Sequence, residues 1–547
     1  MNLIEDPWLP FRRPGGTVVY GRPAALASPE YTDLSLVRAD FQGAAWQFLI
    51  GLLQTAFAPK DIGEWADRWE TPPTVEELDA AFAPYRDTFV LDGDGPRFMQ
   101  DFDPLANQPE ISVDSLLIEA PGEKPLRDNT DHFIKRGLAE RICPDCAAMA
   151  VFTMQINAPS GGQGHRTGIR GGGPLTTLVL PHDLESTLWR RLWLNVLDQE
   201  NNDFPASEPE NGSVFPWLTA TRKSDREGSE VFPDDVHPLH VYWAMPRRFR
   251  LMFEFTPCYC DLCGRESQTS VPALRAKNHG NNYAGAWVHP FTPYRLDPKK
   301  PAEPPLSTKG QPGGIGYRQW ESLLLEDREG RGQMPAQVVH DYAARKAPVL
   351  DEIEDTAQRA RLWAFGYDMD NMKARGWYAR EMPLLVVAPE AQDQMLAWVE
   401  QLTSVAVQVA RRTQTAVRSA WFSRPKDAKG DFSYIGQRVF EATEADFYTC
   451  LFDLWDAVCA GEEGVLPEPV AKRWYTHLHD AALQVFDDLS LTGDTGALDM
   501  KRIVRARNEL NKWLAGGKPM KELQAAAGWQ GKPGQTGRST RKQKEGT

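Results

Sequence analysis

The fold is indicated most clearly by residues 392–422, which read QDQMLAWVEQLTSVAVQVARRTQTAVRSAWF. Apolar side chains recur there every three or four residues, so that one stripe runs along a helix: Met395, Trp398, Val399, Leu402, Val405, Ala406 and Val409. Helical segments follow at about residues 435–460, 468–489 and 499–514, with glycine or proline between them. Four amphipathic helices with modest connections predict an antiparallel four-helix bundle.

The residues before this bundle mix short strands, helices and long irregular loops. Residues 39–57 carry apolar side chains at helical spacing, whereas residues 248–255 alternate, with a predicted buried face of Phe249, Leu251, Phe253 and Phe255. We therefore predict an α+β protein in three parts. These are a large mixed N-terminal domain over residues 1–390, the four-helix bundle over 391–516 and a disordered basic tail over 517–547.

The net charge limits the kinds of partner that the chain can hold. Lysine and arginine number 61 against 75 aspartates and glutamates, which leaves a formal charge of −14 over 547 residues. That charge argues against gripping nucleic acid with the whole surface, but it leaves room for a local basic site. The acidic start is unlike a signal peptide, and the most apolar run, residues 44–58, is too short and polar to span a bilayer. We expect a cytoplasmic protein with no membrane partner.

Two C-x-x-C pairs, Cys143 with Cys146 and Cys260 with Cys263, predict a metal site. Four thiolates suit a tetrahedral zinc ion and leave no position for a substrate, so the zinc would be structural. The N-terminal domain would then contain a zinc knuckle that ties together two loops far apart in the sequence. Unrelated buried thiols are the alternative interpretation, and Cys258 is an alternative ligand whose spacing to Cys260 is too tight for a standard knuckle.

Residues 159–173, PSGGQGHRTGIRGGG, contain seven glycines. The segment matches neither a P-loop nor a dinucleotide-binding fingerprint. Glycines let the backbone approach a ligand closely, and Arg166 and Arg170 add cations, which together suit a narrow groove or a line of phosphates. A flexible surface loop explains the composition equally well.

Three His-Asp pairs raise a catalytic alternative: His182-Asp183, His340-Asp341 and His479-Asp480. An HD-type metal-dependent phosphohydrolase needs one such pair together with a further histidine and a distant aspartate. Scattered pairs arise by chance, and the chain has no Gly-x-Ser-x-Gly or His-Glu-x-x-His motif. We expect no enzyme activity, with a zinc-stapled HD-type phosphohydrolase as the second hypothesis and a structural scaffold protein as the third.

Over residues 1–514 the chain resembles the large subunit of the type I-E CRISPR Cascade complex, the CasA family. The order of four segments carries the resemblance: Asn2-Leu3-Ile4 to Trp8, Asn157-Ala158-Pro159 to Gly172-Gly173-Pro174, Cys263-Gly264-Arg265-Glu266-Ser267, and Trp287-Val288-His289-Pro290. The resemblance implies a non-catalytic subunit of an RNA-guided antiviral complex. That subunit recognises the protospacer-adjacent motif (PAM) of foreign double-stranded DNA from the minor groove, helps to start unwinding and R-loop formation, and helps to recruit a helicase-nuclease.

The family reads the motif with a glycine loop, a lysine finger and a glutamine wedge. The resemblance maps the glycine loop onto Ser160, Gly161, Gly162 and Gln163. Counting back from Trp287 puts the family's lysine at Asn278, one residue after Lys277, so either residue is a candidate finger. The wedge maps onto Asp370, Asn371 and Met372, where Asn371 replaces the family's glutamine and Met372 is the candidate apolar wedge.

The resemblance also implies contacts with the guide RNA and with other Cascade subunits. Within residues 129–142, Phe133, Lys135 and Arg136 are the candidates for contact with the CRISPR guide RNA and the body of the complex. On the bundle, the candidates for contact with target DNA are Arg411, Arg412, Arg418 and Arg424, for which an ordinary solvated helix face is an equal alternative.

Overall fold

The computed structural model describes residues 1–120, 137–300, 303–310, 314–324, 332–353, 359–370, 373–492 and 499–529. The chain forms two compact units, and each is described by itself. Unit 1 comprises Met1–Ile315 and Ser322–Val386, and unit 2 comprises Gly316–Glu321 and Val387–Thr547. The units divide near the predicted boundary at residue 390, but the prediction assigned Gly316–Glu321 to the N-terminal domain, whereas this segment packs within unit 2.

Unit 1 is built around helix α1 (Ala39–Ala56), whose side chains are almost all buried, at the place where the sequence predicts a helix. The Phe48 ring on α1 makes edge contacts with Trp8, Phe89, Phe152 and Trp243, which come from four separate segments. The other α-helices that the structure describes in unit 1 are α2 (Ile62–Glu70), α3 (Val75–Phe82), α5 (Pro144–Asn157), α6 (Leu188–Trp193), α7 (Gln199–Asn202), α8 (His240–Trp243), α10 (Gln337–Asp341) and α11 (Ala347–Ile353). Helix α9 (Trp320–Leu324) runs across the division between the units.

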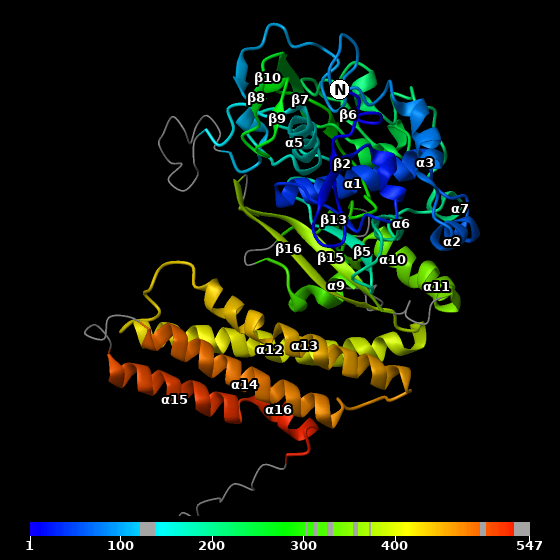
Figure 1. Cartoon of the computed structure of the whole chain (residues 1–547). Coiled ribbons are helices and arrows are strands. Elements are labelled where there is room, and N and C mark those ends of the chain that lie inside the picture. Colours follow the sequence, from blue (N-terminus) through cyan, green and yellow to red (C-terminus); the bar gives the residue numbers. More distant parts are fainter. Residues whose placement is uncertain are drawn as a thin grey trace, which may run out of the picture. The chain divides into compact units, whose positions relative to one another are not determined.

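Three of the antiparallel sheets in the described residues contain the longer strands of unit 1 (Figure 1). The first has the order β16 (Lys373–Leu385), β15 (Arg359–Asp370), β5 (Thr176–Pro181), and its first two strands form a long hairpin. The second has the order β4 (Glu110–Ser112), β10 (Ser270–Lys277), β7 (Arg248–Glu254). The third has the order β2 (Val18–Gly21), β1 (Leu9–Arg12), β3 (Asp33–Leu34).

Shorter strands complete the unit. They are β13 (Leu306–Ser307), β12 (Tyr294–Arg295) and β14 (Gln333–Met334) in one sheet, β8 (Cys258–Tyr259) with β9 (Glu266–Ser267), and β11 (Asn282–Tyr283) with β6 (Glu230–Val231). The described part of the chain is therefore a mixed α+β protein with a helical C-terminal region, as predicted.

The predicted strand at residues 248–255 is present as β7, but its predicted burial is wrong at three places, because Arg248 and Arg250 are buried and Phe255 is exposed. Arg248 is only 1% exposed, because its guanidinium pairs with the equally buried Asp101. Phe255, predicted to face the core, lies beyond the end of the strand and is 85% exposed. A buried ion pair therefore overrides the simple alternation of apolar and polar residues.

In unit 2, helices α12 (Gln392–Trp421), α13 (Ser433–Cys459), α14 (Glu468–Leu491) and α15 (Met500–Gly516) pack side by side (Figure 1). Tyr317, from the upstream segment, stacks on Phe447 with ring centroids 4.3 Å apart, and its hydroxyl lies 2.9 Å from the hydroxyl of Thr443. The predicted disordered tail from residue 517 is wrong for its first part, because helix α16 (Lys518–Ala526) packs on α14 and buries Met520 and Leu523. Among the helices described, none has the length and apolar character needed to cross a membrane.

Candidate nucleic-acid interface and metal centre

The four predicted cysteine ligands lie together in unit 1. Cys143 caps the N-terminus of α5 and Cys146 lies in its first turn, while Cys260 and Cys263 lie in the turn between β8 and β9. All four sulfur atoms lie within 4.8 Å of one another, and the Sγ atoms of Cys143 and Cys263 are 3.8 Å apart. A tetrahedral zinc ion with Zn–S bonds of about 2.3 Å requires sulfur atoms about 3.8 Å apart, so this cluster fits a tetrahedral metal ion.

The backbone closes the turn that carries Cys260 and Cys263, and the cluster favours the thiolate form of these two cysteines. Gly264 adopts a φ of +70° and donates its backbone N–H to the carbonyl of Cys260 over 2.8 Å, which closes the turn. Hydrogen bonds within the cluster, first that from Cys143, lower the pKa of Cys260 to about 6 and also lower that of Cys263, whereas hydrogen bonds with those two cysteines and burial raise the pKa of Cys143 and of Cys146. The thiolate is the form of cysteine that binds metals. Cys258 does not belong to this cluster, so the four cysteines of the two C-x-x-C pairs are the candidate ligands.

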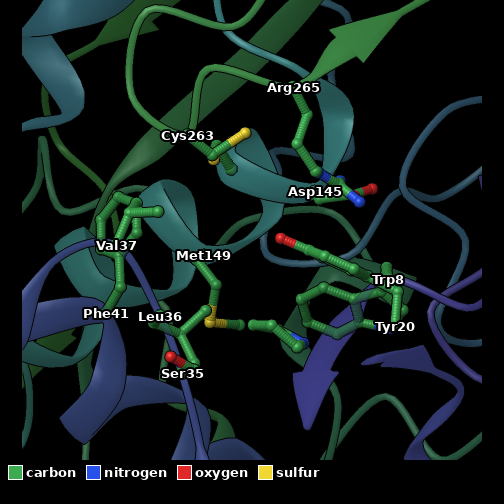
Figure 2. Close-up of a pocket in the computed structure, with 12 residues that line it drawn as sticks. Trp8, Tyr20, Ser35, Leu36, Val37, Phe41, Asp145, Met149, Cys263 and Arg265 are labelled. Atoms are coloured by element: carbon green, nitrogen blue, oxygen red, sulfur yellow. The ribbon is translucent and has the colours of Figure 1, made fainter. Parts of the chain in front are cut away.

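A small, partly open surface hollow adjoins the cysteine cluster (Figure 2). Its walls include Trp8, Phe41 and Met149, together with Cys146 and Cys263 from the cluster. At its edge Arg265 pairs with Asp145 and lies over the Tyr20 ring, 3.7 Å from the ring centroid. The sequence alone did not reveal this cation–π contact, which joins the knuckle to strand β2.

The glycine loop and the candidate finger lie against each other. Ser160 to Gln163 are all exposed, and the Asn278 side-chain amide donates to the Gln163 carbonyl over 3.0 Å. The backbone N–H of His279 donates to the Gly164 carbonyl over 2.9 Å. Lys277, the last residue of β10, is exposed beside this junction. The fold thus brings together two segments that are more than 100 residues apart in the sequence.

Individual glycines of this loop differ in their surroundings. A Cβ atom at Gly161 would lie 2.8 Å from Cβ of His165, so a side chain there would clash within the protein. A Cβ atom at Gly162 would have no described atom within 4 Å and would point into open space. Gly162 is therefore the position where a ligand can approach the backbone most closely.

The two arginines of the loop do not serve as the free cations that the sequence predicts. Arg170 is 3% exposed and donates to Oε1 of Gln47 over 2.8 Å and to the hydroxyl of Thr176 over 3.0 Å, and burial lowers its pKa to about 10. Arg166 donates to the hydroxyl and to the carbonyl of Ser224 over 2.8 and 2.9 Å. Both guanidinium groups hold the loop in place by hydrogen bonds to neutral groups.

The β15–β16 hairpin, which carries the predicted wedge, contacts the end of the glycine-rich segment 159–173. Asp370, the last residue of β15, pairs with Lys373, the first residue of β16. Asn371 and Met372, which connect them in the sequence, lie outside the described residues, and so do the side chains of Asp370 and Lys373. Just before them, Met369 packs with Tyr367 against Ile118 and Met154. A Cβ atom at Gly173 would lie 2.3 Å from the Met369 side chain, so the end of the glycine-rich segment touches the hairpin.

The candidate guide-RNA residues are followed by a described segment that contacts the knuckle. Phe133, Lys135 and Arg136 lie outside the described residues. Just after them, the backbone N–H groups of Glu140 and Arg141 both donate to the Asp261 carboxylate over 2.7 Å, which attaches this segment to the knuckle.

In unit 2, the four predicted arginines are also unlike one another. Arg411 and Arg424 are exposed, whereas Arg412 lies over the Trp513 ring and Arg418 donates to the Pro425 carbonyl over 2.7 Å. The guanidinium of Arg418 is therefore used within the unit, and Arg411 and Arg424 are the better candidates for an external ligand.

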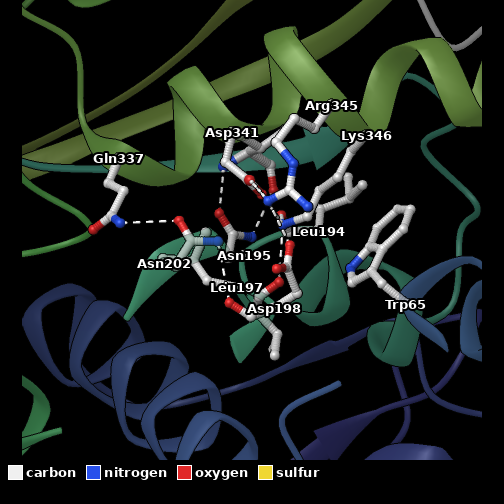
Figure 3. Close-up of polar contacts among 12 residues, drawn as sticks. Trp65, Leu194, Asn195, Leu197, Asp198, Asn202, Gln337, Asp341, Arg345 and Lys346 are labelled. Carbon is white, nitrogen blue, oxygen red and sulfur yellow. Dashed lines mark hydrogen bonds and ion pairs between the residues drawn. The ribbon is translucent and has the colours of Figure 1, made fainter. Parts of the chain in front are cut away.

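The structure gives the HD-type alternative no support. In the described part of the chain, the cysteine cluster is the one group of three or more metal-ligating side chains that lie close enough to hold an ion. Asp341 instead joins a buried ion network with Arg345, Lys346 and Asp198 (Figure 3). In that network, Nζ of Lys346 lies 2.8 Å from the Asp341 carboxylate and donates to the carbonyls of Leu194 and Val196.

Comparison with known proteins agrees with this architecture. The chain matches the family model of the CRISPR-associated protein Cse1 over residues 2–485. Among solved structures, CasA from Thermus thermophilus superposes with a TM-score of 0.67 at 17% identity, covering 94% of this chain and 99% of that chain. Thermobifida fusca Cse1 gives a TM-score of 0.68 at 17% identity, covering 96% and 98%.

A chain of a structure titled CRISPR RNA-guided surveillance complex gives a TM-score of 0.61 at 16% identity, covering 94% of this chain and 99% of that chain. These solved chains share the fold of this protein from end to end. The family match covers nearly the whole chain, and the protein belongs to the CRISPR-associated Cse1 family.

Proposed function

We propose that this protein is the non-catalytic large subunit of a type I-E Cascade complex and that it reads the PAM of double-stranded DNA. Its partners are the other Cascade subunits, the CRISPR guide RNA, the target DNA and a helicase-nuclease effector. The observation that carries the proposal is the meeting of the glycine loop with the Lys277–Asn278 segment in one exposed place, with the hairpin end close to Gly173.

The glycine loop supplies the close approach that a minor groove demands. That groove is only about 6 Å wide, so backbone without side chains can approach the base edges more closely than most side chains can. Exposed Ser160 to Gln163 offer peptide groups for hydrogen bonds, and Gly162 has open space in front of its Cα atom. Because minor-groove recognition is degenerate, a few such contacts select a short motif rather than a long sequence.

The finger role falls to Lys277 rather than to Asn278. The Asn278 amide already donates to the loop backbone, so it fixes the shape of the glycine loop. Lys277 is exposed at the end of β10, where its ammonium group can donate to groove acceptors or to phosphate. Asn371 and Met372 then act as the wedge, at the connection between Asp370 and Lys373, by separating a base step next to the motif.

A structural zinc ion at the four cysteines completes this arrangement. Cys143, Cys146, Cys260 and Cys263 would hold it, with no position left for a substrate. The ion would attach the start of α5, and the segment before it that the resemblance assigns to the guide RNA, to the β8–β9 turn. A fixed knuckle thus holds the candidate guide-RNA segment and strand β10 in a fixed position relative to each other.

The helical unit is proposed to act as an antiparallel four-helix bundle, since consecutive packed helices with short connections must alternate in direction. Exposed Arg411 and Arg424, together with exposed Lys512 on helix α15, offer weak phosphate contacts. Such contacts add to DNA binding in the assembled complex, where other subunits and the guide RNA supply most of the affinity.

The test is a gel-shift titration of the assembled complex with two duplexes that differ only in the PAM. Lys277→Ala should reduce the preference for the correct motif, while the exposed Lys60→Ala serves as a control for loss of one positive charge. Unchanged preference in Lys277→Ala would remove the finger role. Absence of any preference in the wild-type complex would contradict the proposed function itself.

A further inference from the structure

The hairpin strand β15 lies along helix α1 through three successive contacts. Gly43 faces Phe365 so closely that a Cβ atom on the glycine would lie 2.5 Å from the ring. One helical step further along, the rings of Trp46 and Trp363 meet edge to face, 5.2 Å apart. In the other direction, Asp40 meets Tyr367. Steps of three residues on the helix match steps of two on one face of the strand, so this face of β15 follows α1 toward the hairpin end.

The contact nearest the hairpin end is polar and belongs to a network that is buried at Tyr367 and Asp40 and half-buried at Arg38 and Glu119. The Tyr367 hydroxyl donates to the Asp40 carboxylate over 2.5 Å, and Asp40 is only 3% exposed. Arg38 donates to both oxygens of the same carboxylate over 2.9 Å each, and its guanidinium also lies 2.7 Å from the Glu119 carboxylate. One chain of charge-assisted hydrogen bonds therefore joins Tyr367 to Glu119.

The pKa shifts of Tyr367 and Arg38 keep both groups in the protonated form that donates these hydrogen bonds. Burial, followed by the nearby Asp40 carboxylate, raises the pKa of Tyr367, so that its hydroxyl remains a donor. Burial lowers the pKa of Arg38, but hydrogen bonds with Asp40 and Glu119 outweigh it and raise that pKa, so that Arg38 stays charged. Every charge in the chain of contacts thus has a partner of opposite charge.

The segment that carries Glu119 also contacts the hairpin directly, through its neighbour Ile118. Ile118 packs in one apolar cluster with Tyr367 and Met369, the last residues before the end of β15. Ile118 therefore contacts this stretch of the hairpin directly, while its neighbour Glu119 reaches the same stretch only through Arg38 and Asp40. Residues 118–120 precede, by eight residues of sequence, the segment 129–142 that the resemblance assigns to the guide RNA.

We propose that Tyr367 is a positioning residue for PAM recognition, and that its bond to the Asp40–Arg38–Glu119 network couples the hairpin end to the segment before the candidate guide-RNA loop. The inference rests on the proposed function, because it assumes that the hairpin end engages DNA. A shift of the segment at Glu119 would move the hairpin end, and DNA at the hairpin end would in turn act on that segment, since such coupling is reciprocal.

The neighbouring strand provides a matched control. Tyr378 on β16 stands opposite Gly366, one residue before Tyr367, and its buried hydroxyl has no hydrogen-bond partner among the described residues. Tyr378→Phe therefore removes the same atom from the same hairpin without breaking a bond. Tyr367→Phe removes the atom that ties the hairpin to Asp40.

The experiment measures the ratio of affinities of the reconstituted complex for duplexes with the correct and an altered PAM. Tyr367→Phe should lower this ratio about tenfold, which corresponds to the loss of a bond worth ~1.4 kcal/mol, with Tyr378→Phe unchanged. Glu119→Gln should lower it as well, and the double variant Glu119→Gln with Tyr367→Phe should lose less than the product of the two single losses.

Melting of the isolated subunit and its affinity for the rest of the complex are measured in parallel. An unchanged ratio in Tyr367→Phe, or equal losses in Tyr367→Phe and Tyr378→Phe, would overturn the inference. Strictly multiplicative losses in the double variant would overturn the coupling to Glu119. A wild-type complex without PAM preference would overturn the proposed function, and the inference with it, so the two failures are distinguishable.

Discussion

Replacement of Gly162 by valine separates DNA recognition from folding more cleanly than any other change in the glycine loop. A Cβ atom there would meet no described atom within 4 Å, and Gly162 is absent from the glycines with positive φ, so the valine fits without strain. We expect the free energy of unfolding of the subunit to change by less than ~0.5 kcal/mol, as at other exposed sites. At Gly161 the same change would clash with His165, so an effect on folding could not be separated from an effect on DNA binding.

The effect on DNA should be large, because the isopropyl group stands where a base edge would lie. If the loop is pushed back by one side-chain layer, about two hydrogen bonds at ~1 kcal/mol each are lost. A loss of ~2 kcal/mol lowers the affinity for the correct PAM about 30-fold. Affinity for a duplex with an altered PAM should fall much less, because those contacts are not made there.

The assay is a gel-shift titration of the assembled complex at fixed salt, since phosphate contacts make affinity depend on salt. Gly95→Val serves as the control, because a Cβ atom at exposed Gly95 also has no described atom within 4 Å. A Gly162→Val complex that binds the correct PAM as tightly as the wild type would refute the argument for close backbone approach. An equal loss in Gly95→Val would refute its specificity.

Three other predictions concern the metal and the core. Elemental analysis should find about one zinc per chain, and Cys260→Ser should abolish it; a folded, zinc-free wild-type protein would remove the metal site. Lys346→Met should destabilise unit 1 by ~3 kcal/mol in urea unfolding, because Lys346 is 0% exposed and the change leaves Asp341 with one cation fewer. Burial lowers the pKa of His240 from 6.5 to about 4, so its contribution to stability is complete above pH 6.5 and is lost as the pH falls toward 4, at ~1.4 kcal/mol per pH unit. Urea midpoints at pH 7 and pH 5 should differ less in His240→Gln than in the wild type.

Sequence patterns determined those features that depend on local spacing. The stripe of residues 395–409 predicts α12 because burial of one helix face follows from a period near 3.6. The two C-x-x-C pairs likewise predict a four-thiol site, and the structure places those four sulfur atoms together. The helix stripe and each C-x-x-C pair lie within short segments, although the two cysteine pairs themselves are more than 100 residues apart.

Only the tertiary structure decided which of the predicted residues are available. Arg170 reads as a cation for a ligand, yet it is buried against Gln47 on α1, more than 100 residues away in the chain. Asn278 reads as a candidate finger, yet its amide is used on the Gln163 carbonyl. The bond between Tyr367 and Asp40 crosses more than 300 residues, and no local pattern marks it. Hydrogen-bond partners of buried polar groups come from distant parts of the chain, because each such group must be satisfied wherever the fold happens to bring a partner. The sequence therefore determined which segments are helical and which cysteines can share a metal, while long-range packing decided which polar side chains remain free to meet DNA.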